Sequence, residues 1–353
     1  MTSSTDTTPL ARTVLVLGAN GRFGRAAVHA FAAAGWQVLA QLRRAPRAPL
    51  PAGVHVVMGD ALDVAALARA SQGTQIVVNG LNPLYTEWAD KLPPQTAAVL
   101  ALTRALGATL MLPGNVYNFG RALPALLSEA TPFVADHAKA AQRIAVEAAL
   151  RQAARQDGVR SIVIRAGDFL GDAGTWADLA MLKGLGARLA KGRRGHFTHL
   201  GPTDLPHAWA WLPDLAATFE HVAALQLAQP GRLAPHTVLH FAGHTLTGEQ
   251  LQQSIETALG QPLQRAALPW WTLRLASPFV PLLRALLQMR YLWQRPHQLD
   301  GRALSALLAE TGPVPHTPLP MLARALLAQA APASAVAAGE AAGRVRSAAR
   351  RAG

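Results

Sequence analysis

The sequence contains no cysteine, and that absence removes several classes of function. Without a thiol there is no disulfide scaffold, no thiolate nucleophile and no cysteine-ligated zinc or iron–sulfur cluster. Charged residues are also scarce, at 15%, whereas half of the 353 residues are apolar. This balance favours a folded globular protein over a disordered one, and the length allows one large domain or two moderate ones.

Long uncharged hydrophobic runs are missing as well. The most apolar late segment covers residues 268–293, and three arginines interrupt it. It therefore offers no run of the roughly 18–20 residues that a membrane span needs, although an interfacial amphipathic helix stays an open alternative. Residues 1–12 lack the basic and apolar regions of a secretory signal and are interpreted as a flexible N-terminus. We therefore expect a cytoplasmic protein without a transmembrane segment.

Acidic residues are outnumbered, which gives a formal net charge of +13. A basic balance suggests nucleic acid as a partner. Most of the basic residues, however, are arginines scattered through an alanine-rich chain instead of forming one stripe, so we expect no specific nucleic-acid binding. Four of these arginines fall in residues 339–353. Residues 331–353 lack large apolar side chains and are interpreted as a disordered basic tail.

Short apolar runs alternate with helix-like segments in the first part of the chain. The strand candidates are residues 13–18, 36–42, 54–59, 75–80, 108–113 and 161–167. They are almost continuously apolar, which is typical of strands buried on both faces. Three of the helix-like segments end in a glycine suited to a helix C-terminus, Gly35, Gly73 and Gly107. The alternation predicts an α/β fold with a doubly wound parallel sheet of Rossmann type.

The later part of the chain is less regular. Glycine, proline and histidine are frequent in residues 191–209, which predicts a long loop. Residues 237–260 read as strand, turn and helix, with Thr247 and Gln250 placed for a capping box. Residues 268–330 are apolar and predict helices. We therefore expect a smaller, mainly helical portion after the sheet.

A glycine-rich turn, "GANGRFG", separates the first predicted strand from the first predicted helix. Small residues let the backbone approach a pyrophosphate, and the helix N-terminus offers free N–H groups and the positive end of its dipole. The turn follows a strand and opens a helix, so the context of a dinucleotide-binding turn is present. The residues expected to bind the cofactor here are Gly18, Asn20, Gly21, Arg22, Phe23 and Gly24.

Carboxylates are absent between Asp6 and Asp60. An NAD-binding turn usually has an acidic residue about 20 positions further on, where it holds the ribose diol. Arg43 and Arg44 stand at the end of the second strand instead, and with Arg22 they offer guanidinium groups that suit a 2′-phosphate. NADP is therefore favoured over NAD, the alternative being that these arginines form only a solvated loop.

The order of the motifs resembles the short-chain dehydrogenase/reductase superfamily, in particular its extended epimerase/dehydratase type and atypical relatives. The similar features are "GANGRFG" (18–24), "GDALD" (59–63), "VVNGLNP" (77–83), "GNVYNFG" (114–120), Lys139, "IRAGDFLG" (164–171) and "HAWAWLPDLA" (207–216). Beyond these motifs the resemblance is loose. It implies further cofactor contacts from Asp60, Ala61, Asn79, Gly80, Leu81 and Lys139.

The resemblance also implies a division of the chain. Residues 13–225 are interpreted as an NAD(P)-binding Rossmann domain whose loop 171–206 reaches toward the substrate pocket, and residues 226–330 as a substrate-binding portion. Members of the family commonly dimerise through the two helices after the fourth and fifth strands. A homodimer is thus one assembly that the resemblance implies.

The family's catalytic set is incomplete in this sequence. That set is a tyrosine, a lysine four residues later on the same helix, and a Ser or Thr ending the preceding strand. Four residues are about one helical turn, so the ammonium lowers the pKa of the phenol. No Tyr-x-x-x-Lys occurs in the chain: Ala135 stands four residues before Lys139, and Pro113 takes the place of the Ser or Thr.

Tyr117 and Lys139 remain as the catalytic candidates. The family's tyrosine at the position of Tyr117 is mainly structural, so a pocket wall is the alternative for this side chain. Lys139 is also expected to bind the nicotinamide ribose, the alternative being an exposed helical lysine.

The carboxyl edge of the sheet, where open α/β sheets bind ligands, supplies the candidates for the substrate. These are Asn118, Arg165, Asp168 and His207. A structural ion pair is the alternative for Arg165. His196 and His199 lie in a glycine-rich segment with no nearby carboxylate except Asp204, so no metal site is expected.

Three functions follow from these features. The first is an NAD(P)-dependent oxidoreductase or epimerase/dehydratase-like enzyme acting on a small carbonyl or hydroxyl substrate. The second, favoured by the missing tyrosine and serine, is a non-catalytic regulator that binds NADP(H) and senses its redox state. The third is a peripheral membrane protein that acts on a lipid-like substrate through residues 268–293.

Overall fold

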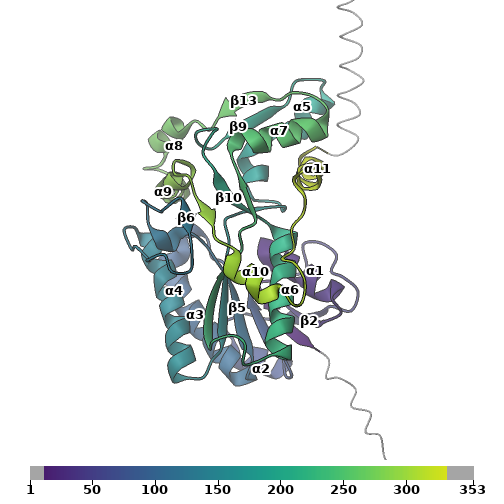
Figure 1. The fold of residues 1–353 in the computed structure, drawn as a ribbon, viewed down its shortest axis with the longest axis vertical. Coiled ribbons are helices and arrows are strands. Elements are labelled where there is room, and N and C mark those ends of the chain that lie inside the picture. Colours follow the sequence, from purple (N-terminus) through teal and green to yellow (C-terminus); the bar gives the residue numbers. More distant parts are fainter. Residues whose placement is uncertain (1–11, 332–353) are drawn as a thin grey trace, which may run out of the picture.

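A computed structural model describes residues 12–331 of the chain. Its centre is a seven-stranded parallel sheet in the order β3-β2-β1-β4-β5-β7-β11 (Figure 1). The strands are β1 (Thr13–Leu17), β2 (Gln37–Leu42), β3 (His55–Met58), β4 (Ile76–Asn79), β5 (Thr109–Gly114), β7 (Ser161–Arg165) and β11 (His236–His240). The predicted Rossmann-type fold is confirmed. The predicted N-terminal and C-terminal tails lie outside the described residues, apart from Arg12 and Ala331.

Helices cover both faces of this sheet. They are α1 (Arg22–Ala33), α2 (Val64–Ala70), α3 (Trp88–Leu106), α4 (Ala138–Gln156), α6 (Leu212–Ala228) and α10 (Arg302–Leu308). Helices α3 and α4 lie on one face, and α1 and α6 on the other (Figure 1). The sheet's last strand, β11, comes from the range assigned to the C-terminal portion, and it pairs with β7 along its whole length.

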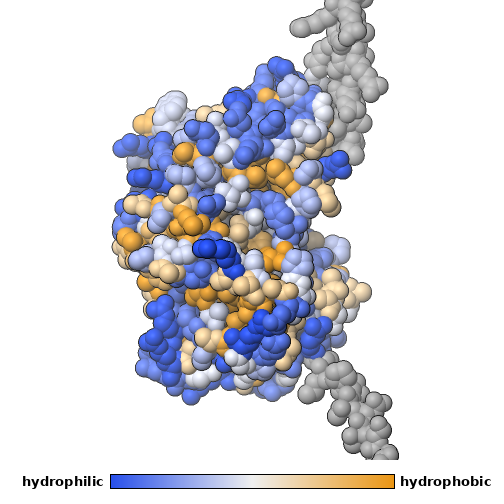
Figure 2. Space-filling model, in the orientation of Figure 1, coloured by the Kyte–Doolittle hydropathy of each residue, from blue (hydrophilic) through white to orange (hydrophobic). Residues whose placement is uncertain are grey.

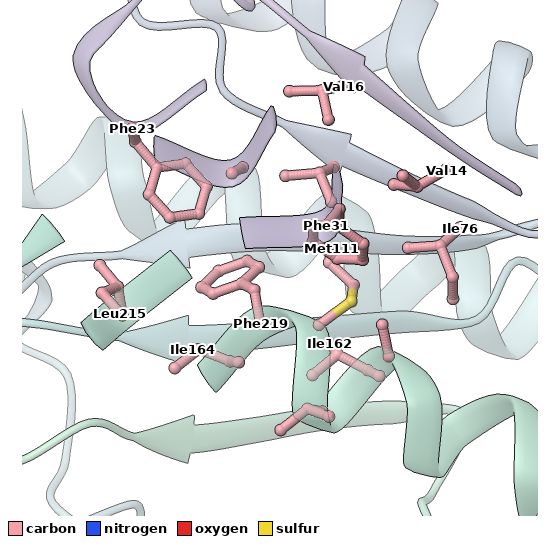
Figure 3. Packing of buried hydrophobic residues seen from close by; sticks show 14 of the residues in the cluster. Val14, Val16, Phe23, Phe31, Ile76, Met111, Ile162, Ile164, Leu215 and Phe219 are labelled. Atoms are coloured by element: carbon pink, nitrogen blue, oxygen red, sulfur yellow. The ribbon is translucent and has the colours of Figure 1, made fainter. Parts of the chain in front are cut away.

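Neighbouring residues of β1 explain why the strands are apolar throughout. Val14 and Val16 belong to the core beneath α1 and α6, whereas Leu15 and Leu17 belong to the core beneath α3 and α4. Successive side chains of a strand point to opposite faces, so a sheet covered on both faces needs apolar residues at every position. Figure 3 shows the first of these cores, in which strand side chains meet aromatic rings of α1 and α6.

A smaller unit lies at the carboxyl edge of the sheet and has its own apolar core. Its elements are β8 (Asp168–Leu170), η3 (Ala177–Met181), α5 (Leu185–Ala190), β9 (His196–His199), β10 (His207–Trp211), β12 (His244–Leu246), α7 (Gly248–Leu259), β13 (Gln264–Ala267), α8 (Trp270–Ala276), α9 (Pro281–Gln288), η4 (Arg290–Trp293) and α11 (Leu319–Ala330). Short helical turns η1 (Tyr85–Glu87) and η2 (Tyr117–Phe119) and a small pair of strands, β6 (Leu126–Leu127) and β14 (Gln298–Leu299), complete the fold.

The prediction of a long loop at residues 191–209 is wrong. The segment contains β9 and the start of β10, and β9 pairs with β13, which lies far along the chain. In β9 only alternate residues are buried, Phe197 and His199, so no apolar run marked it as a strand. The capping box of Thr247 and Gln250 is confirmed at the start of α7. No helix of residues 12–331 is long and apolar enough to cross a membrane.

Candidate functional site

The glycine turn between β1 and α1 forms a close-packed cradle. Gly18 has a φ of +69°, which favours glycine. A Cβ on Gly24 would lie 2.3 Å from the carbonyl oxygen of Gly18, and one on Gly80 would lie 2.8 Å from that of Leu17. No side chain caps the N-terminus of α1 at Gly21. The first N–H groups of the helix therefore keep the capacity to bind an anion.

Gln41 fastens this cradle to the next strands, a role that the sequence analysis missed. The backbone N–H of Gly18 donates to Gln41 Oε1 at 2.9 Å, and Gln41 Nε2 donates to the carbonyl of Gly59 at 2.6 Å. Gln41 is 1% exposed. The available signal was a single amide side chain among the apolar residues 38–42.

Asn20, predicted as a cofactor contact, holds the loop that carries Arg43 and Arg44. Its Nδ2 donates to the carbonyls of Arg44 and Ala45, at 3.3 and 3.1 Å, and its Oδ1 accepts from the N–H of Arg47 at 3.0 Å. Both predicted arginines are exposed, and neither forms an ion pair within residues 12–331.

Arg22 does not join these two arginines. Its guanidinium donates to the carbonyl of Gly174, in the segment after β8, and Arg25 pairs with Asp172 in the same segment. The structure thus directs Arg22 away from the loop in which the sequence analysis placed a 2′-phosphate. Phe23 points into the core instead, with its ring 4.7 Å from that of Phe219.

The other residues expected to bind the cofactor lie at the ends of β3 and β4, beside the cradle. Asp60 is exposed and accepts from the N–H of Leu62 at 3.0 Å, and Ala61 is buried. Asn79 pairs in register with Leu17 at the end of β1, and its Oδ1 accepts from the N–H of Leu81 at 3.1 Å. The structure therefore brings these residues together with the glycine turn at one edge.

Lys139 lies in the first turn of α4, and Ala135 lies before that helix. The ammonium of Lys139 donates to the backbone carbonyl of Tyr85 and sits 4.9 Å from the centre of the Trp88 ring. Burial lowers the pKa of Lys139. The family's arrangement of tyrosine and lysine on one helix is therefore absent at this position.

Tyr117 pairs with Tyr85 instead, a partner that spacing had not indicated. The two hydroxyl oxygens lie 2.6 Å apart. Burial raises the pKa of Tyr85, and burial together with the neighbouring phenol raises the pKa of Tyr117 well above its ordinary value. Both phenols therefore stay protonated around neutral pH.

Arg165 and Asn118, both expected at the substrate, lie in a buried network. Glu147 of α4 accepts from Arg165 Nη2 at 2.8 Å and from Asn118 Nδ2 at 2.9 Å. None of the three is more than 1% exposed. The structural ion pair considered for Arg165 is the arrangement that the structure contains, and Glu147 is a residue that the sequence analysis missed.

Asp168 and His207 form a pair at the entrance to the smaller unit. His207 Nε2 lies 3.0 Å from Asp168 Oδ2, and Nδ1 lies 3.3 Å from the carbonyl oxygen of Leu292. His297 packs against His207 with the ring centres 4.5 Å apart, and burial lowers the pKa of His297 to about 3. His207 also lines a small pocket whose walls include the apolar Met181, Leu205, Trp209, Leu292 and Trp293 and the polar His199 and Arg295.

One group of side chains in the described part of the chain could hold a metal ion, and it is not the one weighed from sequence. Ligand atoms of Asp214, His244 and His316 all lie within 4.8 Å of one another. Asp214 already accepts from the N–H and hydroxyl of Thr317, at 2.6 and 2.7 Å. These bonds tie the segment before α11 to α6 and account for the buried carboxylate without a metal.

Comparisons with known proteins agree with this geometry. A family model described as NAD(P)H-binding matches residues 18–181. No curated protein matches the sequence significantly. UDP-glucose 4-epimerase from Bifidobacterium longum, solved with NAD+ and UDP, is 15% identical with a TM-score of 0.64, over 89% of this chain and 97% of that chain.

Two further solved structures are similar at the same level. UDP-N-acetylglucosamine 4-epimerase from Bacillus cereus is 12% identical with a TM-score of 0.64, over 90% of this chain and 98% of that one. A partial-consensus L-threonine 3-dehydrogenase is 17% identical with a TM-score of 0.67, over 90% and 98% of the two chains. At such identities the likeness establishes the fold.

Proposed function

We propose that this chain, an NAD(P)H-binding protein with the fold of the extended short-chain dehydrogenases/reductases, is an NADP-preferring oxidoreductase or epimerase-like enzyme for a small carbonyl or hydroxyl compound. The observation that carries the proposal is the pair of phenols, Tyr85 and Tyr117, whose oxygens lie 2.6 Å apart. Together with Lys139 they form a polar cluster beside the nucleotide-binding edge.

The residues present fit a dinucleotide. The cradle of Gly18, Gly24 and Gly80 has no room for a Cβ, and the uncapped start of α1 suits a pyrophosphate. In this proposal Arg43 and Arg44 bind the 2′-phosphate, because both are exposed and free of carboxylate partners among the described residues. When bound, the cofactor supplies hydride chemistry.

In this proposal the protein's own side chains supply the proton that accompanies hydride transfer. Because its pKa is raised, the hydroxyl of Tyr117 stays protonated at pH 7 and cannot act as a base. In this proposal it gives its proton only to a strongly basic oxygen, such as the alkoxide that hydride addition to a carbonyl would leave, which is the reductive direction. Tyr85 lies between this hydroxyl and Lys139, which holds the Tyr85 carbonyl and so positions the pair.

Asp168 and His207 serve the substrate in this proposal. One oxygen of Asp168 contacts His207, and the charge of this mostly buried carboxylate adds to the effect of burial in raising the pKa of both phenols. The free oxygen can accept a hydrogen bond from a substrate hydroxyl.

Replacing Tyr117 by Phe tests the proton donor. Against a panel of small aldehydes and ketones, Tyr117→Phe should lower the rate of NADPH oxidation by about 100-fold or more while leaving NADPH affinity unchanged. Tyr291→Phe is the matched control, because its hydroxyl contacts His137, at 3.2 Å, and not the phenol pair.

Two results would count against the proposal. If Tyr117→Phe turns over like the wild type, the proton comes from another group. If the wild-type protein binds NADPH yet oxidises it with no member of the panel, while binding alters a partner interaction, the regulatory function replaces the enzymatic one.

A further inference from the structure

The segment formed by α8, α9 and the turn between them exposes large apolar side chains. Trp271 is 70% exposed, Leu275 68% and Phe279 85%, and these are the highest values among the exposed large hydrophobic residues of the described chain. Val280 and Leu282 extend the same surface, at 40% and 45%. We call these five residues the apolar tip. Helices α8 and α9 lie at one end of the smaller unit (Figure 1), where the surface in Figure 2 mixes apolar and polar residues.

The opposite side of the segment is firmly attached to the protein. Trp270 is buried, its indole N–H donates to the carbonyl of Leu200 at 2.7 Å, and the guanidinium of Arg290 stacks 5.5 Å from its ring centre. Ala285 of α9 is buried as well. The segment is therefore amphipathic: one side belongs to the core and the apolar tip has no partner among the described residues.

The charges along the segment that carries the apolar tip are of one sign. No Asp or Glu occurs between Glu256 and Asp300, whereas five arginines do. Arg274 and Arg284 flank the tip, are exposed and form no ion pair within the described residues. Exposed apolar groups beside unpaired arginines are typical of a surface that enters the headgroup region of an anionic bilayer.

We propose that the apolar tip docks the protein onto an anionic lipid bilayer. A second copy of the chain fits less well, because a two-fold contact would place the arginines of one copy against those of the other. The chain's own residues 332–353 also carry arginines and a single carboxylate, so their charge does not complement the tip.

Docking through the apolar tip would also place the candidate site near the membrane, because the tip and the site are connected. Helix α9 contacts η1, which contains Tyr85, and it leads into η4, which supplies Leu292 and Trp293 to the pocket wall. A protein docked through α8 and α9 therefore holds this pocket close to the lipid surface. The docking itself does not depend on the proposed catalytic activity.

Co-sedimentation of the full chain with vesicles tests the proposal. The wild type should bind vesicles made of equal parts phosphatidylcholine and phosphatidylglycerol better than vesicles of phosphatidylcholine alone, and binding should weaken as salt is added. Trp271→Ser with Phe279→Ser should reduce binding by about tenfold or more, because each side chain loses most of its apolar transfer free energy. Met321→Ser, which changes another exposed residue, of 59%, is the control.

A second double variant separates the contribution of charge to vesicle binding from that of apolar contact. Arg274→Gln with Arg284→Gln should abolish most of the preference for phosphatidylglycerol while circular dichroism stays unchanged. The proposal is overturned if Trp271→Ser with Phe279→Ser sediments like the wild type. It is also overturned if the wild type sediments with neither kind of vesicle. If Trp271→Ser with Phe279→Ser then converts a dimer to a monomer in light scattering, a second copy of the chain covers the tip.

Discussion

The two sides of the sheet's carboxyl edge differ in the groups that form them: backbone groups on one side and polar side chains on the other. The side formed by β1, β2 and α1 is a backbone surface, in which glycines bring carbonyls and N–H groups together. The side formed by β5, β7 and α4 is made of buried polar side chains that satisfy one another across the fold, such as Arg165 with Glu147. We therefore expect the first side to be disrupted when a side chain is added to a glycine, and the second when one member of a polar pair is removed.

Adding atoms to the glycine side should have the largest effect. Gly24→Val should lower NADPH affinity by about 100-fold or more, because its Cβ would lie 2.3 Å from a backbone oxygen that cannot move aside. Gly231→Ala is the control, since a Cβ there meets open space. Calorimetric titration measures both, and wild-type affinity in Gly24→Val would show that the dinucleotide binds elsewhere.

Removing a partner on the polar side should cost stability. Arg165→Met leaves the buried carboxylate of Glu147 without its cation, and we expect the free energy of unfolding in urea to fall by about 3–5 kcal/mol. The double variant with Glu147→Leu should recover at least half of that loss. A loss below about 1 kcal/mol for the single variant would mean that Arg165 is not held as described.

Acid should weaken the contact between the smaller unit and the rest of the fold through His297, which packs against His207. The unfolded histidine has a pKa near 6.5, but in the folded protein burial lowers it to about 3. Only the unfolded chain gains a proton between these values, so this stabilising contribution is present above pH 6.5 and is lost as the pH falls toward 3. Between pH 7 and 5 the loss is about 2 kcal/mol.

The variant His297→Gln should lack this part of the pH dependence, whatever its own stability at pH 7. Urea unfolding at pH 7 and pH 5 measures the difference for each protein. His221→Gln, at a side chain that is 41% exposed, should keep the wild-type slope. An unchanged slope in His297→Gln would assign the acid sensitivity to other buried histidines.

Substitutions in the loop beside the glycine side, which carries Arg43 and Arg44, should have the smallest effect of those considered. Arg43→Ala with Arg44→Ala is expected to weaken NADPH binding about tenfold and leave NADH binding unchanged, because only NADPH carries a 2′-phosphate. Arg47→Ala is the control in the same loop, since its backbone N–H, which contacts Asn20, is retained. Equal losses for both cofactors would remove the argument for NADP.

The same contrast explains what could be predicted from the sequence. The glycine turn and the six strands depend on local sterics and apolar periodicity, and both are visible in a short window of sequence. The absence of a tyrosine four residues before Lys139 is also local. The fold was therefore predicted correctly, and the model of an NAD(P)H-binding family matches residues 18–181, which include the glycine turn.

The polar side depends on pairs that are distant along the chain. Tyr85 meets Tyr117 across 32 positions, and Asp168 meets His207 across 39. Each of these side chains is visible in the sequence, but their partners follow only from the register of the sheet and the packing of α4. Gln41 was missed for the same reason, because Gly18 and Gly59, which it joins, flank different strands.

The position of β11 late in the chain affects how the sheet forms during synthesis. This strand completes the sheet beside β7, yet 70 residues of the chain separate the two. During synthesis β7 emerges first and remains a sheet edge with unpaired backbone groups until residues 236–240 follow. A version of the chain shortened at residue 225 would keep the glycine turn and lose this strand, so it would carry a permanently open edge and a strong tendency to aggregate.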